Sequence, residues 1–266
     1  MKTYIVDSFT AEPFRGNPAG VCLCETIPPE SRMLNIAAEL GLSETAFVVR
    51  RDDGRYGIRY YSPKMEIPLC GHATLASAKV LFDRDPGVDA IHFVTGTDVH
   101  LETRLDGDRV AMKFPAYSLQ DAEVPPAMLE ALGLTAVVDT KYNSETDILM
   151  LVVDSSATLV DLKPDFELLV KSHDAIAGVL VTAAMDGEYD ICSRFFWPWS
   201  GTQEDPVTGA THTFMAPYWL QRLGKAKLKS FQASERTGCV NVTVIDQGTV
   251  EIAGHACIVL EGELRV

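Results

Sequence analysis

Two segments of the chain predict mostly apolar helices, and in the first of them apolar residues occupy every face of the helix. The two segments are residues 71–83 (GHATLASAKVLFD) and residues 210–224 (ATHTFMAPYWLQRLG). A helix without a polar face has to be buried on all sides. Short β-rich runs bounded by turn residues precede and follow both segments. We therefore expect each helix to lie at the centre of a sheet that curls around it.

The order of strands, one glycine-led apolar helix and further strands occurs twice along the chain. This pattern predicts an α+β protein of two pseudo-symmetric domains, each a curled, mostly antiparallel sheet around one central helix. The first domain is expected to comprise residues 1–117 plus about 255–266, and the second residues 118–254. Residues 28–42 (PPESRMLNIAAELGL) predict one surface helix, because prolines open the segment and a glycine follows its apolar periodicity.

The composition limits the partners of this chain. Its 266 residues are 47% hydrophobic, enough for one large domain or two smaller ones. The formal net charge of −14 argues against nucleic acid or an anionic membrane as a partner. A small anionic metabolite would have to be held by local donors. No apolar window long enough to span a bilayer and no leader pattern occurs, so we expect a cytoplasmic protein without a membrane contact.

The cysteine and glycine patterns indicate neither a metal nor a cofactor. Six cysteines, at positions 22, 24, 70, 192, 239 and 257, are sparse compared with a disulfide scaffold. No H-E-x-x-H or C-x-x-C pattern occurs, and the dinucleotide and P-loop glycine patterns are absent as well. We therefore expect no bound metal and no cofactor.

Each apolar helix is preceded by a polar loop that contains glycine: residues 69–74 (LCGHAT) and residues 204–211 (EDPVTGAT). A helix N-terminus has unpaired amide donors, which suit a carboxylate or phosphate. Each loop alone fits an ordinary helix cap, with Asp205 as the N-cap and Pro206 in the first helical position. Two such loops facing each other would hold an anion in a cleft between the domains.

Three side chains near the first loop have properties that suit proton transfer. Glu44 follows a helix end among apolar neighbours, bracketed by the hydroxyls of Ser43 and Thr45, although the same residues also fit a simple turn. His72 suits acid–base chemistry near neutral pH, or a hydrogen-bonded helix start. Cys70 stands where a thiol tends towards the thiolate. A two-base racemase would need a matching cysteine in the second loop, which has none.

Residues 189–200 (YDICSRFFWPWS) add a cation and several aromatic side chains to the second half. They fit a pocket for a flat or cyclic carboxylate, with Arg194 as its counter-ion. They also fit a buried core, and the sequence leaves both interpretations open.

Four motifs together resemble those of one protein family. Residues 7–21 (DSFTAEPFRGNPAGV), 42–48 (LSETAFV), 70–76 (CGHATLA) and 204–212 (EDPVTGATH) are similar, in order and spacing, to the phenazine-biosynthesis isomerase-like (PhzF-like) family. That family has the diaminopimelate epimerase-like fold. The resemblance implies two pseudo-symmetric domains with the site in the cleft between them, proton transfer without a cofactor, and commonly a homodimer.

The resemblance also assigns roles to individual residues. It implies that Glu44 is the general acid or base, assisted by His72 and Asp205. It implies that the substrate is bound by Asn17, Cys70, Gly71, Thr208, Gly209 and Ala210. The family often has serine where this chain has Ala210, so the hydroxyl expected at this position is missing. If that serine helps to bind or protonate the family's dihydro-hydroxyanthranilate substrate, this protein handles a different molecule.

We therefore expect a cofactor-independent isomerase that moves a proton on a small carboxylate-bearing metabolite, cyclic ones included, with Glu44 as general acid and base. One alternative is a cysteine-assisted epimerase or racemase that uses Cys70. Another is a non-catalytic member of the family that binds a small molecule or a protein.

Overall fold

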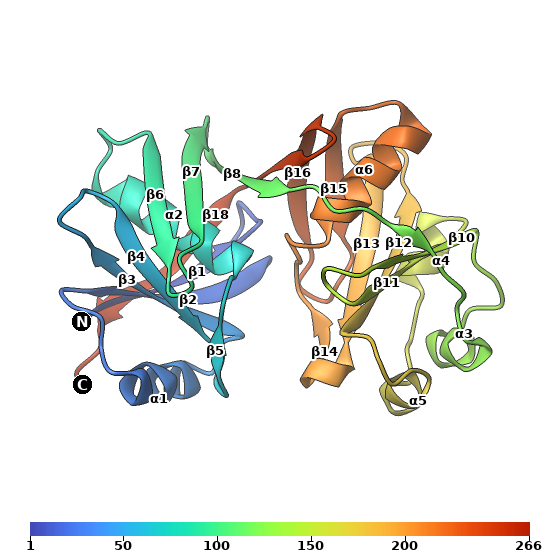
Figure 1. Cartoon of the computed structure of the whole chain (residues 1–266), viewed down its shortest axis with the longest axis horizontal. Helices are drawn as coiled ribbons and strands as arrows, with labels where there is room; N and C mark the ends of the chain where they lie inside the picture. Colours follow the sequence, from blue (N-terminus) through green and yellow to red (C-terminus); the bar gives the residue numbers. More distant parts are fainter. The chain divides into compact units, whose positions relative to one another are not determined.

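The computed structural model describes residues 1–266, and the chain divides into two compact units. Unit 1 comprises Met1–Lys113 and Glu251–Val266, and unit 2 comprises Phe114–Val250. Strands β8 (Arg109–Pro115) and β17 (Thr249–Gly254) carry the chain from one unit to the other (Figure 1). The chain thus leaves unit 1 once and returns to it for its last strand.

Unit 1 is a mixed sheet with one helix inside its curl and one outside. Its strands pair in the order β18–β1–β2–β3–β4–β6–β7–β8, and the pairs β2–β3 and β4–β6 are parallel. Besides β8, this unit contains β1 (Lys2–Ser8), β2 (Asn17–Cys24), α1 (Glu30–Leu40), β3 (Glu44–Arg50), β4 (Tyr56–Tyr61), β5 (Glu66–Ile67), α2 (Gly71–Arg84), β6 (Ala90–Thr95), β7 (His100–Asp106) and β18 (Ala256–Glu263).

Unit 2 repeats this pairing pattern. Its strands pair in the order β9–β10–β11–β12–β13–β15–β16, with β11–β12 and β13–β15 parallel. The elements are β9 (Gln120–Asp121), α3 (Pro126–Leu132), β10 (Asp139–Asn143), β11 (Ile148–Val152), α4 (Ser156–Val160), α5 (Phe166–Lys171), β12 (Gly178–Ala184), β13 (Ile191–Trp197), the 3₁₀ helix η1 (Pro198–Ser200), β14 (Thr202–Asp205), α6 (His212–Leu223), β15 (Lys227–Gln232) and β16 (Gly238–Asp246). The predicted α+β duplication around two central helices is confirmed.

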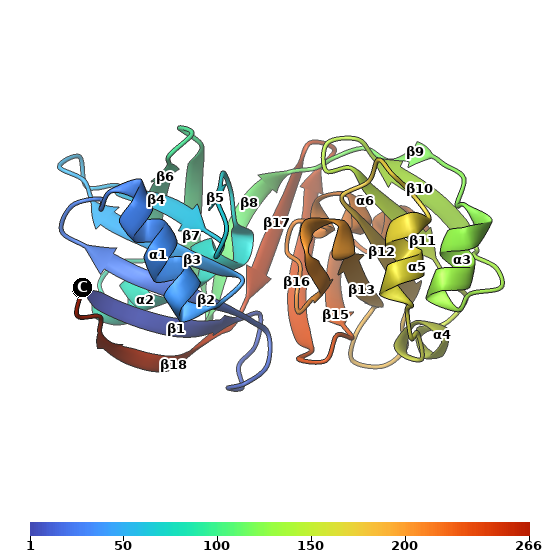
Figure 2. The same ribbon diagram turned by 90° about the horizontal axis from the view of Figure 1, so that it is seen from below.

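The two central helices are buried as their composition predicts. Helix α2 packs against β1, β2, β3 and β18, and lies inside the curl of the unit 1 strands in Figures 1 and 2. Helix α6 packs against β15 and β16 in unit 2. By contrast, α1 lies on the outer side of unit 1, against β3 and β4, and ends at Gly41 in the left-handed conformation. All three predicted helices are therefore present.

A proline within α6 is accommodated by a bond from outside the helix. Pro217 lacks the amide that would bond to the carbonyl of Thr213, four residues earlier. The backbone amide of Tyr117 donates to that carbonyl instead, at 2.9 Å. The segment at the start of unit 2 thus replaces the hydrogen bond that the proline removes.

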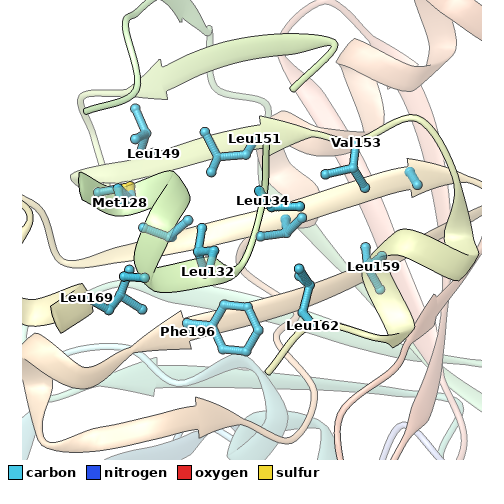
Figure 3. Close-up of a cluster of buried hydrophobic side chains, with 14 of the residues drawn as sticks. Met128, Leu132, Leu134, Leu149, Leu151, Val153, Leu159, Leu162, Leu169 and Phe196 are labelled. Atoms are coloured by element: carbon cyan, nitrogen blue, oxygen red, sulfur yellow. The ribbon is translucent and has the colours of Figure 1, made fainter. Parts of the chain in front are cut away.

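Three short helices of unit 2 were not predicted. Helices α3, α4 and α5 cover one side of the unit 2 sheet, and α3 packs against α5 (Figure 2). Beneath them lies the core cluster of Figure 3, which includes Met128, Leu132, Leu151, Leu159, Leu169 and Phe196. Helices of five to seven residues are too short for a periodic apolar pattern. The Ser155 and Asp165 N-caps of α4 and α5 were the available signal.

The strand register reveals a local sequence repeat between the units. In unit 1 Tyr61 of β4 faces Glu66 of β5, and in unit 2 Phe196 of β13 faces Glu204 of β14. Alignment on these pairs superimposes residues 59–63 (RYYSP) and 66–71 (EIPLCG) on residues 194–198 (RFFWP) and 204–209 (EDPVTG). Each unit therefore has an arginine, two aromatic residues, a glutamate and a glycine in equivalent places.

The repeated arginine and glutamate form the same ion pair in both units. Arg59 donates to Glu66 through Nε and Nη2, and Arg194 donates to Glu204 through the same two nitrogens. Each guanidinium also lies over the second aromatic ring of its motif, Tyr61 or Phe196, at 5.4 and 4.9 Å. Each pair thus holds the strand that leads into the central helix.

We predict that the two ion pairs differ in their contribution to stability because they differ in burial. The side chains of Arg194 and Glu204 are 12% and 17% exposed, against 25% and 32% for Arg59 and Glu66. Glu204→Gln should lower the free energy of unfolding by about 3 kcal/mol, since it leaves a buried guanidinium uncompensated. Glu66→Gln should cost about 1 kcal/mol. Urea unfolding followed by circular dichroism measures both, and equal losses would contradict the prediction.

Candidate functional site

A cluster of three titratable side chains lies at the N-terminus of α2 in unit 1. Glu44 is the first residue of β3, Cys70 is the N-cap of α2, and His72 lies in its first turn. The Glu44 Oε2 atom is 3.3 Å from His72 Nε2, and Cys70 Sγ is 3.4 Å from His72 Nδ1. All three residues are buried, with 8 to 9% of each exposed. The structure thus brings together three of the predicted site residues.

Hydrogen bonds from α2 itself and from neighbouring segments fix this cluster. Ser8 Oγ, at the end of β1, donates to the carbonyl of His72 at 2.8 Å. Thr74 Oγ1 donates to the carbonyl of Cys70 at 2.7 Å. Ser43 Oγ lies 3.5 Å from His72 Nε2 and donates to Asn17 Oδ1 at 3.4 Å. The predicted binding residue Asn17 therefore belongs to the same group of side chains.

The imidazole of His72 is neutral at pH 7. Burial lowers its pKa, although the neighbouring Glu44 carboxylate opposes this effect. The geometry fits the tautomer in which Nε2–H donates to Glu44 and Nδ1 accepts from the Cys70 thiol. A neutral imidazole can then donate a hydrogen bond to the Glu44 carboxylate without transferring a proton to it.

The prediction that two hydroxyls bracket Glu44 is correct for one side only. Successive residues of a strand point to opposite faces, so Thr45 points away from the cluster. Its Oγ1 lies against Gly20, where a Cβ atom would be only 2.7 Å away. Ser43 alone contributes a hydroxyl beside Glu44 and His72.

The second loop, in unit 2, forms a separate hydrogen-bonded group around Asp205. Thr208 Oγ1 donates a very short hydrogen bond to Asp205 Oδ2. Gln232, on β15, accepts from the Thr208 amide at 2.9 Å and donates to the Asp205 carbonyl at 2.8 Å. Sequence reasoning missed Gln232, because only the folding of β15 beside this loop brings the two together.

The prediction that Asp205 is the N-cap of the second helix is wrong. Asp205 is the last residue of β14, and α6 begins only at His212, with Thr211 as its N-cap. Between them the chain forms 3₁₀-type turns, in which the amides of His212 and Thr213 bond to the carbonyls of Gly209 and Ala210. Pro206 therefore does not open the helix but continues the chain from the strand.

The missing hydroxyl at position 210 has no local substitute. Ala210 is exposed, whereas Thr211 is fully buried and its hydroxyl donates to the Thr208 carbonyl at 3.0 Å. In neither central helix does a side chain cap the N-terminus. Backbone amides are thus the donors that both N-termini offer to a ligand.

Most of the aromatic segment in β13 and η1 is structural, which favours the core interpretation over the pocket. The Arg194 guanidinium bonds to Glu204 and to the carbonyl of Leu162 at 2.7 Å. Phe196 belongs to the core cluster of unit 2, and Trp199 Nε1 donates to the carbonyl of His173 at 2.8 Å. Arg194 is therefore not free to act as a counter-ion for a substrate.

His212 connects the second loop to its helix. Its Nδ1 lies 3.0 Å from the carbonyl of Thr208, and its buried Nε2 has no hydrogen-bond partner. Burial lowers the pKa of His212 to about 4. The ring is therefore neutral at pH 7, with its proton on Nδ1, where it donates to Thr208.

We predict that acid destabilises the protein partly through His212. An unfolded histidine has a pKa of about 6.5, so the unfolded chain binds more protons and stability falls as the pH drops from 6.5 towards 4. The loss should be on the order of 2 kcal/mol between pH 7 and pH 5. His72 acts in the same direction.

Urea unfolding of wild type and His212→Asn at both pH values, followed by tryptophan fluorescence, measures this effect. All three tryptophans lie in unit 2, so their signal reports the unit that contains His212. The asparagine amide can still donate to Thr208 but cannot titrate. The same pH dependence in both proteins would contradict the prediction.

Comparison with known proteins identifies the fold and the family. A probable proline racemase from Agrobacterium radiobacter, 12% identical, covers 100% of this chain and 93% of its own with a TM-score of 0.62, and so shares the epimerase-like fold. The family described as phenazine biosynthesis-like protein matches residues 6–262. This chain belongs to that family, as its motifs indicated.

Two further relatives show how similar its members are. An uncharacterized isomerase of Pseudomonas aeruginosa is 42% identical over 262 residues, 98% of this chain and 97% of that protein. The crystal structure of a PhzF-family phenazine biosynthesis protein from Enterococcus faecalis is 36% identical, covers 100% of this chain and 99% of its own, and has a TM-score of 0.93. Family and fold support an isomerase or epimerase. No helix here has both the length and the apolar character needed to cross a bilayer.

Proposed function

We propose that the protein is a cofactor-independent isomerase in which Glu44 moves a proton between two carbons of one small carboxylate-bearing substrate. The observation that supports this most directly is the buried Glu44 carboxylate, 3.3 Å from the neutral imidazole of His72. Burial limits the water around this carboxylate, and its remaining lone pairs can accept a proton from carbon.

The proposed reaction needs no oxidant and no second substrate. Glu44 removes a proton from a carbon next to the carboxyl group or an unsaturated centre, and the electron pair of the broken C–H bond is delocalised into that conjugated system. Glu44 then gives a proton to another carbon, which restores the carboxylate. Because Glu44 is 8% exposed, its proton exchanges with solvent between the two steps in part of the turnovers. His72 Nε2–H donates to Glu44 in the charged state and so positions it between the two steps.

The N-terminus of α2 supplies binding for the substrate anion. Cys70 and Gly71 begin this helix of 14 residues directly beside Glu44 and His72. Its unpaired amides and positive helix end favour a carboxylate. A chain with net charge −14 repels anions at long range, so these local donors have to provide the affinity.

We predict that Glu44→Gln abolishes proton exchange on carbon while substrate still binds. Wild type and variant are incubated in heavy water with cyclic and amino-substituted carboxylates, including dihydro-hydroxyanthranilate, and followed by NMR. Deuterium should enter a substrate carbon only with wild type, because the amide cannot accept the proton. Equal labelling by the variant would exclude Glu44 as the base. Ligand binding without any labelling by wild type would favour the non-catalytic alternative.

Asp205 is assigned to the same reaction only by its place in the family motif. Asp205→Asn retains the size of the side chain and its ability to accept from Thr208, but removes its charge. This variant in the same labelling experiment tests the assignment.

A cysteine-assisted epimerase is the second candidate, and one observation favours it. Cys70 Sγ lies 3.4 Å from His72 Nδ1, within reach of a base that could activate the thiol. The duplication argues against a two-cysteine mechanism, because Thr208 occupies the position in unit 2 that is equivalent to Cys70, and its hydroxyl donates to Asp205.

We predict that Cys70→Ala retains the rate of deuterium incorporation to within about tenfold, since it leaves the Glu44–His72 pair intact. The same labelling experiment measures it, with Cys257→Ser as a control for cysteine loss elsewhere in unit 1. Loss of labelling in Cys70→Ala alone would make Cys70 the base and support the epimerase.

A further inference from the structure

The cluster at the start of α2 combines three different metal-binding donor types. Glu44, Cys70 and His72 each offer one ligand atom, and these atoms all lie within 4.8 Å of one another. An imidazole nitrogen, a carboxylate oxygen and a thiolate sulfur are the three donors that Zn²⁺ uses in proteins. The spacing of residues in the sequence did not indicate this group of donors, because Glu44 lies on a different element from Cys70 and His72.

The separations are close to those that a tetrahedral zinc ion requires. Zn–S bonds of about 2.3 Å and Zn–N or Zn–O bonds of about 2.0–2.1 Å place neighbouring donors roughly 3.3–3.6 Å apart. Here Nε2 of His72 is 3.3 Å from Oε2 of Glu44 and 4.0 Å from Sγ of Cys70. The sulfur lies closer to Nδ1, at 3.4 Å, so it has to move towards Nε2 for both atoms to bind one ion.

The surroundings hold two of the three donors in place. The carbonyl of His72 accepts from Ser8, and the carbonyl of Cys70 accepts from Thr74, whose hydroxyl lies 2.5 Å from that of Tyr60. These bonds fix the backbone from which the two side chains extend. Three protein donors leave the fourth tetrahedral position for water or an anion.

We propose that Glu44, Cys70 and His72 bind one Zn²⁺ ion, and that this ion inhibits the protein instead of serving as its cofactor. On binding, the Cys70 thiol passes its proton to His72 Nδ1 and the Nε2 proton of His72 goes to solvent, so that the sulfur and Nε2 both form bonds to zinc with the net release of one proton. Sulfur as a ligand selects zinc over magnesium and calcium, which prefer oxygen. The inhibition, which rests on the proposed function, follows because the metal occupies the Glu44 lone pair that would accept the substrate proton.

Cobalt(II) tests the site without any assay of activity. Chelator-treated full-length protein is titrated with CoCl₂ and followed by absorption spectroscopy. One equivalent should give a thiolate-to-cobalt charge-transfer band and intense visible bands of tetrahedral cobalt, and ZnCl₂ should displace both. Cys70→Ser should lose the charge-transfer band, and Glu44→Gln should weaken binding. Cys257→Ser, a matched cysteine control in unit 1, should keep the wild-type spectrum.

The outcomes separate this proposal from the proposed function. No charge-transfer band in wild type, or an undiminished band in Cys70→Ser, would overturn the zinc site. Circular dichroism of each variant shows that a lost band does not reflect unfolding. In the deuterium assay, Zn²⁺ should inhibit wild type and the Cys257→Ser control alike, and a chelator should reverse the inhibition. Failure of the labelling itself would bear on the isomerase alone and leave the cobalt result intact.

Discussion

The burial of a helix on all of its faces is the constraint on which the rest of this structure depends. Helix α2 has no polar face to turn to water, so the unit 1 sheet has to curl around it. The first-turn amides of such a helix still need partners, and its N-terminus is the end at which Glu44, Cys70 and His72 gather. The fold therefore creates a polar position within an apolar interior, and the candidate site occupies it.

The large features of the fold could be predicted because they follow from the composition and from the spacing of apolar residues along the chain. The apolar run behind Gly71 and the mostly apolar segment within residues 210–224 favour buried helices, and Gly41 marks the end of the surface helix. What could not be predicted depends on contacts between distant residues. Ser8 and His72 are 64 positions apart, and no local pattern relates them.

The errors at the second loop have a common cause. Asp205–Pro206 has the composition of a helix start, but Gln232 and Thr208 hold the Asp205 group as the end of a strand, and α6 begins seven residues after Asp205. Tertiary hydrogen bonds thus override the local capping preference. Likewise, the aromatic segment next to Arg194 has the composition of both a core and a pocket, and only the ion pair with Glu204 decides between them.

Unit 2 is inserted into the sequence of unit 1, so the two units obtain their full set of strands at different times during synthesis. Unit 2 is continuous in sequence, and every strand of its sheet is available before residue 251 is made. Unit 1 is not, because β1 pairs with β18, and the backbone of Met1 bonds to that of Leu264 in both directions. The N-terminal strand therefore has to wait for the last strand, so the unit that is translated first is completed last. Until then, one edge of β1 remains exposed on the nascent chain.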